Sequence, residues 1–231
     1  TISAAELTMA LMLSVARKVA MADRSMKAGA WDRAKLGGGE LYGKTLGLVG
    51  AGRIGGEVAI RARAFGMRVL IHDPFLHADR AKALGAELAS LDDVLAQADF
   101  LSVHVPLTDS TAGLIGAAQL AKLRPSAVVL NVARGEIIDE AALVDALRAG
   151  IIAGAGLDVY STEPLPADHP LRSLENAVLT PHLGASTEEA QQNVALEIAA
   201  AVRAMLLEGD LSRAVNAPGV GGDRMRRLRP L

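Results

Sequence analysis

Three side chains of the types needed for alcohol oxidation occur in the second half of the sequence, Arg134, Glu163 and His182. Removing the proton of a hydroxyl group near neutral pH calls for a base such as the imidazole of His182. A carboxylate beside an imidazole fixes its tautomer and stabilises its charged form, which is the role expected of Glu163. Arginine binds a carboxylate through two parallel hydrogen bonds, so Arg134 is expected to hold an anionic 2-hydroxy or 2-oxo acid.

Each of these residues also has an ordinary structural interpretation. Arg134 could cap a loop, Glu163 could be a surface residue beside Pro164, and His182 could pair with the backbone at a strand end. Each nevertheless follows a predicted strand, and the carboxyl ends of parallel strands meet at one crevice, where ligands bind. Their joint position therefore favours a functional role for these three residues over a purely structural one.

A glycine fingerprint lies earlier in the chain, at Gly50, Gly52 and Gly55. It follows a short apolar run, residues 46–49, and precedes apolar residues at helical spacing, so the order is strand, tight turn and helix. Gly50 permits the turn, Gly52 lets a pyrophosphate approach the backbone, and Gly55 lets the helix pack closely. The free N–H groups of the helix N-terminus complete a predicted dinucleotide site.

Asp73 ends the next predicted strand, residues 68–72. A carboxylate at that position accepts hydrogen bonds from the adenine ribose and repels a 2′-phosphate, which predicts NAD rather than NADP. A chain with 23 glycines can show this spacing by chance. The prediction therefore depends on the strand, the helix and the acid around the fingerprint.

Residues 38–45 and His104 are weaker candidates for a ligand-binding role. Residues 38–45 formally match the phosphate loop of nucleoside triphosphatases, but that loop follows a strand and opens a helix, whereas this segment precedes the strand at 46–49. We interpret it as a linker. His104 lies inside another predicted strand, before Pro106, and a buried histidine bonded to the backbone is at least as plausible there as a cofactor contact.

The composition excludes several classes of function. The chain is 51% hydrophobic with a formal net charge of −2, and its basic cluster, residues 224–229, has no interleaved aromatics, so no nucleic-acid partner is expected. The absence of cysteine excludes disulfides and thiol catalysis. The longest uncharged apolar stretch, residues 7–16, is too short for a bilayer, so no membrane partner is expected. The histidines show no metal-ligand spacing, so no metal is expected.

Strands and helices alternate along the chain, which predicts an α/β fold with a doubly wound parallel sheet, a Rossmann NAD-binding domain. The predicted strands are residues 46–49, 68–72, 87–88, 100–105, 127–132, 154–159 and 177–180. The predicted helices between them are residues 54–65, 78–84, 90–98, 117–123 and 140–149.

Capping boxes predict helices at both ends of this pattern. One at Ser3 to Glu6 opens a helix to about Met26, and another at Ser186 to Glu189 opens a helix that ends near Gly209. The first helix is apolar on most of its circumference, so either the core or a second subunit must cover it. We predict a domain over residues 1–208 and a tail over residues 209–231.

Several segments together resemble the D-isomer-specific 2-hydroxyacid dehydrogenases. They are residues 43–55, 104–108, 131–135, 156–164 and 180–187. The resemblance runs from about residue 3 to residue 208, and it implies an NAD-dependent enzyme with Arg134, Glu163 and His182 as catalytic residues. The cofactor contacts that it implies are Gly50, Gly52, Arg53, Ile54, Gly55, Asp73, Val105, Val132, Ala133, Arg134, Asp158, His182 and Gly184.

Residues 181–190 are most typical of the phosphoglycerate dehydrogenase branch of that family, so the resemblance implies oxidation of 3-phosphoglycerate to 3-phosphohydroxypyruvate, the start of serine synthesis. A glyoxylate or hydroxypyruvate reductase shares the three catalytic residues and stays open. A non-catalytic NAD-sensing corepressor of the same family also stays open. Glu163 stands where formate-oxidising members have glutamine, which argues against formate.

The same resemblance sets expectations beyond the site. Family members carry a substrate-binding domain, mostly before the position of Thr1, which we expect to be largely missing here, with very low turnover for the chain alone. Residues 213–216 resemble the segment that returns to that domain. The resemblance also implies a homodimer through the cofactor domain and a cytoplasmic location.

Overall fold

A computed structural model describes residues 1–216, which fall into a compact unit, Thr1–Ala185, and a second unit that begins at Ser186. The basic cluster at residues 224–229 lies outside the described residues. The elements in chain order are α1 (Ile2–Ala16), α2 (Val19–Lys27), η1 (Arg33–Lys35), β1 (Thr45–Val49), α3 (Arg53–Ala64), β2 (Arg68–His72), α4 (Ala78–Ala83), β3 (Glu87–Leu88), α5 (Leu91–Gln97), β4 (Phe100–Val103), α6 (Ala117–Leu120), β5 (Val128–Asn131), η2 (Gly135–Ile137), α7 (Glu140–Arg148), β6 (Gly154–Leu157), η3 (Pro170–Ser173), β7 (Ala177–Leu179) and α8 (Glu188–Glu208).

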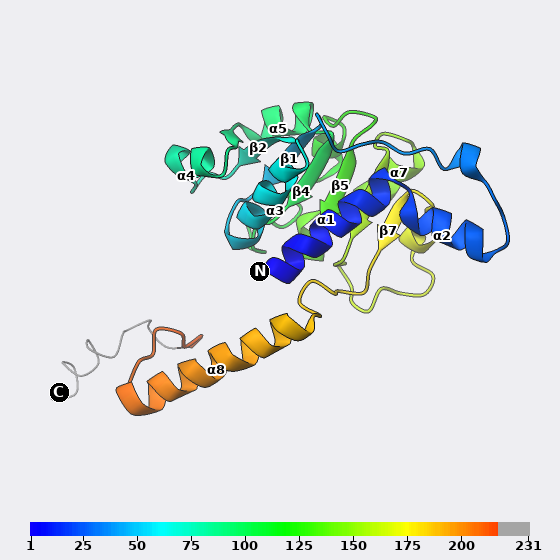
Figure 1. The fold of residues 1–231 in the computed structure, drawn as a ribbon. Coiled ribbons are helices and arrows are strands. Elements are labelled where there is room, and N and C mark those ends of the chain that lie inside the picture. Colours follow the sequence, from blue (N-terminus) through cyan, green and yellow to red (C-terminus); the bar gives the residue numbers. More distant parts are fainter. Residues whose placement is uncertain (217–231) are drawn as a thin grey trace. The chain divides into compact units, whose positions relative to one another are not determined.

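The first unit is built on a seven-stranded sheet in the order β3-β2-β1-β4-β5-β6-β7, and each neighbouring pair of strands is parallel (Figure 1). The chain winds outward from β1 to β3 and then returns to place β4 on the other side of β1. The carboxyl ends of β1 and β4 therefore flank the point at which the winding direction changes, where such sheets bind ligands. The predicted doubly wound parallel sheet is confirmed.

Helices cover both faces of this sheet. One face packs against α1 and α3, whose buried side chains Met12 and Val58 share a core with Leu48 and Leu130 of the strands. The other face packs against α5, α6 and α7. The central strands β4, β5 and β6 are buried at every position, which is why they are mostly apolar rather than alternating, with Ser102 and Asn131 as buried polar exceptions.

The first helix differs from its prediction in two ways. It begins at Ile2 rather than after Ser3, and the side chain of its N-cap, Thr1, accepts no hydrogen bond from the described residues. It also ends at Ala16, and a separate helix α2 follows Lys18, whose φ is 52°. The break has a tertiary cause, because the backbone amide of Gly39 donates to the carbonyl of Ala16 at 2.8 Å and so takes the acceptor of the next helical turn.

The apolar surface of α1 is accounted for by its own unit. Ala5, Leu11 and Met12 are buried between the helix and the sheet, and α1 contacts β5, β6 and β7 as well as α3. Of the two explanations for this helix, core and subunit interface, the structure supports the core.

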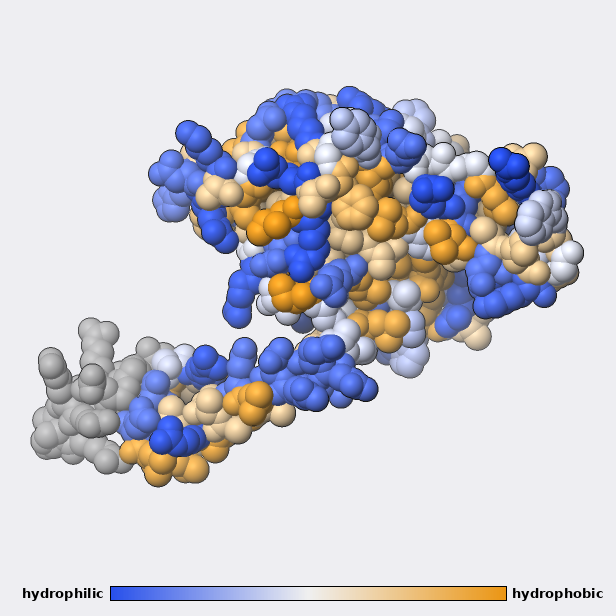
Figure 2. Space-filling view, viewed as in Figure 1, coloured by the Kyte–Doolittle hydropathy of each residue, from blue (hydrophilic) through white to orange (hydrophobic). Residues whose placement is uncertain are grey.

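The second unit contains α8, which the structure describes in full. Thr187 caps it by accepting a hydrogen bond from the amide of Ala190 at 3.1 Å, and it ends before Gly209, as predicted. None of its residues is buried, and apolar side chains lie on the surface of α8 in Figure 2. Its exposed apolar residues include Leu196, Ile198 and Leu206. An apolar face of this kind is typical of one that another protein surface covers.

Two predictions concern the organisation of the chain. The helix predicted to close the first domain lies in the second unit, so a domain boundary at residue 208 stays a prediction. Residues 38–45 do lead into β1 rather than into a helix, which agrees with their interpretation as a linker. Within residues 1–216, no helix combines the length and the apolar character needed to cross a bilayer.

Candidate active site at the carboxyl edge of the sheet

The glycine turn joins β1 to α3 and has no room for side chains at its two ends. Gly50 has a φ of 89°, and a Cβ there would lie 2.8 Å from Val105 Cγ1 and 2.9 Å from the His104 carbonyl oxygen. A Cβ on Gly55 would collide with the carbonyl oxygen of Gly50. A Cβ on Gly52, in contrast, would meet no atom within 4 Å. The middle glycine therefore keeps open a space that the fold itself does not need.

The N-terminus of α3 faces this space. The first backbone hydrogen bond of the helix runs from the amide of Gly56 to the carbonyl of Gly52 at 3.0 Å. The amides of Arg53, Ile54 and Gly55 precede it, and in the described part of the chain they have no backbone acceptor. Such amides, at the positive end of a helix dipole, suit a phosphate.

Asp73 follows β2 and is tied to the same turn. One carboxylate oxygen accepts from the amide of Ala51 at 2.9 Å, and the other accepts from the amide of Phe75 at 2.9 Å. These bonds fix the orientation of the carboxylate beside the glycine turn. Each oxygen keeps a further lone pair, so the group can still accept hydrogen bonds from a ribose.

His104 lies at the end of β4, against the glycine turn. Its Nε2 is 2.8 Å from Ser102 Oγ, and its buried Nδ1 has no hydrogen-bond partner among the described residues. Burial lowers the pKa of His104 to about 4, so the ring is neutral near pH 7. Among the described residues, the histidine side chain therefore bonds another side chain rather than the backbone.

The turn after β5 carries Val132, Ala133 and Arg134 and is shaped by Asn131. The buried Asn131 side chain accepts from the amide of Ala133 at 3.0 Å and donates to the carbonyl of Arg134 at 2.8 Å. The guanidinium of Arg134 donates one bond to the Ala133 carbonyl at 2.6 Å and is otherwise exposed. Arg134 therefore presents free donors at the carboxyl edge of the sheet.

Asp158 organises the segment that carries His182. The fully buried carboxylate accepts hydrogen bonds from Thr180 Oγ1 at 2.6 Å, from the amide of Leu183 at 2.7 Å and from the amide of Gly184 at 2.8 Å. The Asp158 carbonyl also accepts from the amide of His182 at 2.9 Å. These bonds hold His182 at a φ of 56°, a left-handed conformation that a non-glycine residue keeps only when its surroundings impose it.

His182 and Glu163 form a hydrogen-bonded pair. His182 Nδ1 lies 2.6 Å from Glu163 Oε2, and the two side chains are 50% and 35% exposed. Partial burial alone would raise the pKa of the Glu163 carboxyl. The hydrogen bonds from His182 and from the Tyr160 amide, together with the charges of His182 and Arg134, outweigh it and hold that pKa below its ordinary value.

Arg134, Glu163 and His182 line one cavity of about 190 Å³. A second, wider cavity of about 610 Å³ opens beside it, against Glu163, His182 and Arg172. The structure thus brings together the three side chains that the sequence singled out at separate strand ends.

Tyr160 and Gly135 join the arginine turn to the glutamate loop. A Cβ on Gly135 would overlap the backbone of Tyr160 and Ser161, so only glycine lets these two segments touch. The Tyr160 hydroxyl donates to the carbonyl of Thr180 at 2.9 Å, and burial, together with the charge of Asp158, raises the pKa of Tyr160 to about 12. Tyr160 therefore links the segments of all three side chains.

Several residues that shape this site carry no distinguishing motif in the sequence. Asn131 and Thr180 bond the backbone and side chains of the site, yet each looks like an ordinary polar residue at a strand end. Gly135 follows Arg134 directly in the turn after a strand, and this position is the sequence feature that could have identified it. Asp158 was expected as a cofactor contact only, whereas here it also holds the histidine segment.

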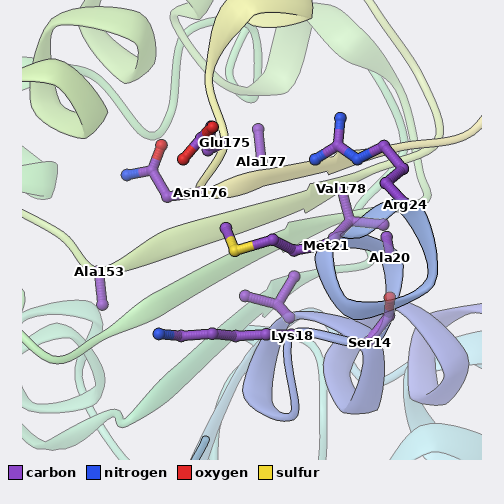
Figure 3. Close-up of a pocket in the computed structure, with 11 residues that line it drawn as sticks. Ser14, Lys18, Ala20, Met21, Arg24, Ala153, Glu175, Asn176, Ala177 and Val178 are labelled. Carbon is purple, nitrogen blue, oxygen red and sulfur yellow. The ribbon is translucent and has the colours of Figure 1, made fainter. Parts of the chain in front are cut away.

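The cavity in Figure 3 lies away from these residues. It has a volume of about 350 Å³ and opens at the amino ends of β6 and β7, opposite the edge that carries His182. Met21 of α2 lies between that helix and the strands, with Lys18, Arg24 and Glu175 around it (Figure 3). Because ligands of doubly wound sheets bind at the carboxyl ends, we do not assign the reaction to this cavity.

Comparison with known proteins agrees with this geometry. The family described as "D-isomer specific 2-hydroxyacid dehydrogenase, NAD binding domain" matches residues 9–184. The chain is 51% identical over its whole length to D-3-phosphoglycerate dehydrogenase 2, chloroplastic, of Arabidopsis thaliana, covering 37% of that protein. It is 48% identical over its whole length to D-3-phosphoglycerate dehydrogenase of Synechocystis sp., covering 41% of that protein.

A solved structure shows the same fold. A glyoxylate reductase from Paecilomyes thermophila, 39% identical, superposes with a TM-score of 0.84 over 90% of this chain and 62% of its own. The chain spans about two fifths of the length of the curated relatives that it matches. It belongs to the D-isomer-specific 2-hydroxyacid dehydrogenases, and it comprises the NAD-binding domain of that family.

Proposed function

We propose that this chain is the cofactor domain of an enzyme that oxidises 3-phosphoglycerate to 3-phosphohydroxypyruvate with NAD. The observation that carries the proposal is the cavity shared by Arg134, Glu163 and His182 at the carboxyl edge of the sheet. Identity near one half to D-3-phosphoglycerate dehydrogenases over the whole chain supports the choice of substrate.

His182 would act as the base. The short bond between its Nδ1 and the Glu163 carboxylate favours a proton on Nδ1, which leaves Nε2 as the acceptor for the substrate hydroxyl proton. The imidazolium formed by that transfer would be stabilised by the adjacent carboxylate. Glu163 is suited to this role because its lowered pKa keeps it ionised.

Arg134 would bind the substrate carboxylate. Only one nitrogen of its guanidinium group is engaged, Nη1 with the Ala133 carbonyl, so the remaining N–H donors can form a paired contact with an anion. Its position in the cavity of His182 would place the hydroxyl-bearing carbon of a 2-hydroxy acid near the imidazole.

NAD would accept the hydride from that carbon. Gly50, Gly52 and the α3 amides of Arg53, Ile54 and Gly55 would hold its phosphates, and Asp73 would bind the ribose. Val105 would lie beside the adenine and Val132 and Ala133 along the cleft. Asp158 and Gly184, which already bond each other, would lie near the nicotinamide with Arg134 and His182.

A second candidate is the reduction of glyoxylate or hydroxypyruvate. The structural similarity to a glyoxylate reductase favours it. Such a reaction would use Arg134, Glu163 and His182 in the reverse direction. The two candidates differ in whether the substrate carries a phosphate.

The proposal extends to a homodimer formed through the cofactor domain. Since α1 is buried in its own unit, the residues of the first unit that we propose for this interface lie in the following segment, where Val19 is 52% exposed, Met26 is 52% exposed and Trp31 is 79% exposed. Large exposed apolar residues close together in sequence are typical of interfaces.

A cytoplasmic location and a return of the tail to a substrate-binding domain stay predictions.

The cofactor part of the proposal is tested by calorimetric titration of the chain with NADH and NADPH, beside the variant Asp73→Ala. We expect NADH to bind, NADPH to bind more weakly, and the variant to lose NADH affinity. The substrate part is tested in the whole enzyme, because very low turnover is expected for the chain alone, by following NADH formation with 3-phosphoglycerate and NADH consumption with glyoxylate. Turnover of glyoxylate without turnover of the phosphorylated acid would reject the first candidate in favour of the second.

A further inference from the structure

Glu140, the first residue of α7, bonds both ends of the loop that carries Glu163. Its Oε1 accepts from Ser161 Oγ at 2.6 Å, and its Oε2 accepts from the Ser161 amide at 3.3 Å. The same Oε1 lies 3.2 Å from His169 Nε2. One carboxylate therefore closes the loop from residue 161 to residue 169, and Glu163 lies inside the closed segment.

The bond to His169 has a defined tautomer. His169 Nδ1 accepts a hydrogen bond from the amide of Leu171 at 3.3 Å, so the ring proton is on Nε2, where it points to Glu140. The two side chains are only 20% and 15% exposed, and Leu171 is fully buried. The far end of the loop is thus anchored in the core through a histidine that needs no positive charge to form its bonds.

The segment between these anchors has little other support. Residues 161–168 form no helix or strand, and most of them are exposed. Arg172 donates to the carbonyls of Leu165 and Pro166 at 2.8 Å, which fixes the middle of the loop but not the end that leads to Glu163. Glu163 itself holds one internal bond, from the Tyr160 amide at 3.1 Å, besides its bond to His182.

We propose that Glu140, Ser161 and His169 form a clamp that positions the Glu163 carboxylate against His182. The inference rests on the proposed function, because it assigns these residues a purpose in the acid-base pair of that site. Glu140 and His169 do not line the cavity of Arg134, Glu163 and His182, whereas Ser161 borders it. All three act through the loop, and Glu140 is the central member of the clamp because it holds both ends.

The geometry favours a positioning role over a general stabilising one. The bond between Glu163 and His182 depends on where the loop places the carboxylate, since the two residues come from different segments of the chain. Loss of the Ser161 anchor would free the loop two residues before Glu163. A displacement of about 1 Å in a supporting segment is enough to reduce catalysis substantially.

Carboxyl-detected NMR of the chain gives a direct test, because Glu163 has a pKa held below its ordinary value by its bonds to His182 and Tyr160. We expect the Glu163 titration to move to higher pH in Ser161→Ala and in Glu140→Gln, as the loop shifts and these bonds weaken. Ser161→Thr retains the hydroxyl at an exposed position and should titrate as the unchanged chain does.

Asp145→Asn is a matched control for Glu140→Gln, because Asp145 is an exposed carboxylate on the same helix. It should leave the Glu163 titration unchanged. If Ser161→Ala and Glu140→Gln remain folded and Glu163 titrates in both as in the unchanged chain, the clamp is refuted. If Glu140→Gln does not fold, Ser161→Ala, which removes a single side-chain bond, decides the question alone.

A kinetic measurement separates this inference from the proposed function. In the active enzyme, Ser161→Ala should lower kcat and change its pH dependence, whereas the affinity for NADH should stay unchanged. A lack of turnover of 3-phosphoglycerate and of glyoxylate in the whole enzyme to which this cofactor domain belongs would refute the proposed function. The NMR titration would still decide whether the clamp holds Glu163, because it needs neither substrate nor cofactor.

Discussion

The amide of His182 donates to the carbonyl of Asp158 at 2.9 Å, while the carboxylate of the same aspartate binds residues on both sides of the histidine. The left-handed backbone of His182 is therefore held by one buried acid. Backbone conformations of this kind cost energy and persist where the surrounding bonds fix them. The position of the proposed base depends on Asp158 as much as on Glu163.

Asp158→Asn should consequently destabilise the histidine segment. The amide nitrogen of asparagine would face one of the N–H groups of Leu183 or Gly184, so one buried donor would lose its acceptor. We expect the free energy of unfolding to fall by roughly 2–4 kcal/mol in urea denaturation. The exposed change Asp145→Asn should stay within about 0.5 kcal/mol of the unchanged chain. Equal effects of the two variants would contradict the role assigned to Asp158.

The glycine turn permits a sharper comparison between two neighbouring substitutions. Gly52→Ala places a methyl group in open space, so the free energy of unfolding should change by no more than about 0.5 kcal/mol. The same methyl group would occupy the proposed phosphate position, and the NADH affinity should fall at least about tenfold, or 1.4 kcal/mol. Titration calorimetry and thermal unfolding measure the two effects separately.

Gly55→Ala provides the opposite case, because its Cβ would collide with the Gly50 carbonyl. It should destabilise the fold itself as well as weaken NADH binding. If Gly52→Ala bound NADH as well as the unchanged chain, the phosphates could not lie at this turn.

Much of this site could be predicted because its signals are local. The residues of the glycine turn and Asp73 are recognisable from a strand, a turn and a helix that follow one another in the chain. Arg134, Glu163 and His182 could be grouped because parallel strands place their carboxyl ends at one edge. Neither inference required a distance between segments.

The rest depends on contacts between distant parts of the chain. The break between α1 and α2 follows from the amide of Gly39, which bonds Ala16 only once the chain has turned back. The link between Glu140 and His169 joins the start of a helix to a loop beyond the next strand, and neither residue belongs to a pattern that predicts the pairing. Periodicity in the sequence carries no information about such bonds.

Gly135→Ala tests the junction between the arginine turn and the glutamate loop. The added Cβ would overlap the backbone of Tyr160 and Ser161, so the two segments must separate. We expect a loss of the order of 3 kcal/mol or more in the free energy of unfolding. A Cβ on Gly39 would meet no atom within 4 Å, so Gly39→Ala is the matched control and should be tolerated. A stable Gly135→Ala variant with an intact Glu163 to His182 bond would show that the junction does not position the pair.

The free energy of unfolding should depend on pH through the protonation of His104. Its pKa is lowered from 6.5 to about 4 by burial, so between these values the unfolded chain binds a proton that the folded chain does not. The free energy of unfolding should therefore decrease as the pH falls from 6.5 to 4, by an amount of the order of 3 kcal/mol at most, and this contribution should level off below pH 4.

His104→Gln removes the titrating group and keeps an amide that can bond Ser102, so the variant should lose stability less steeply over the same pH range. Glu163 does not obscure the comparison. A carboxylate with a lowered pKa contributes stability that is lost as the pH falls below its ordinary value of 4.5, and this loss is the same in the variant and in the unchanged chain. Urea denaturation at a series of pH values measures both slopes. Equal slopes for the variant and the unchanged chain would mean that His104 is protonated in the folded protein as readily as in the unfolded one.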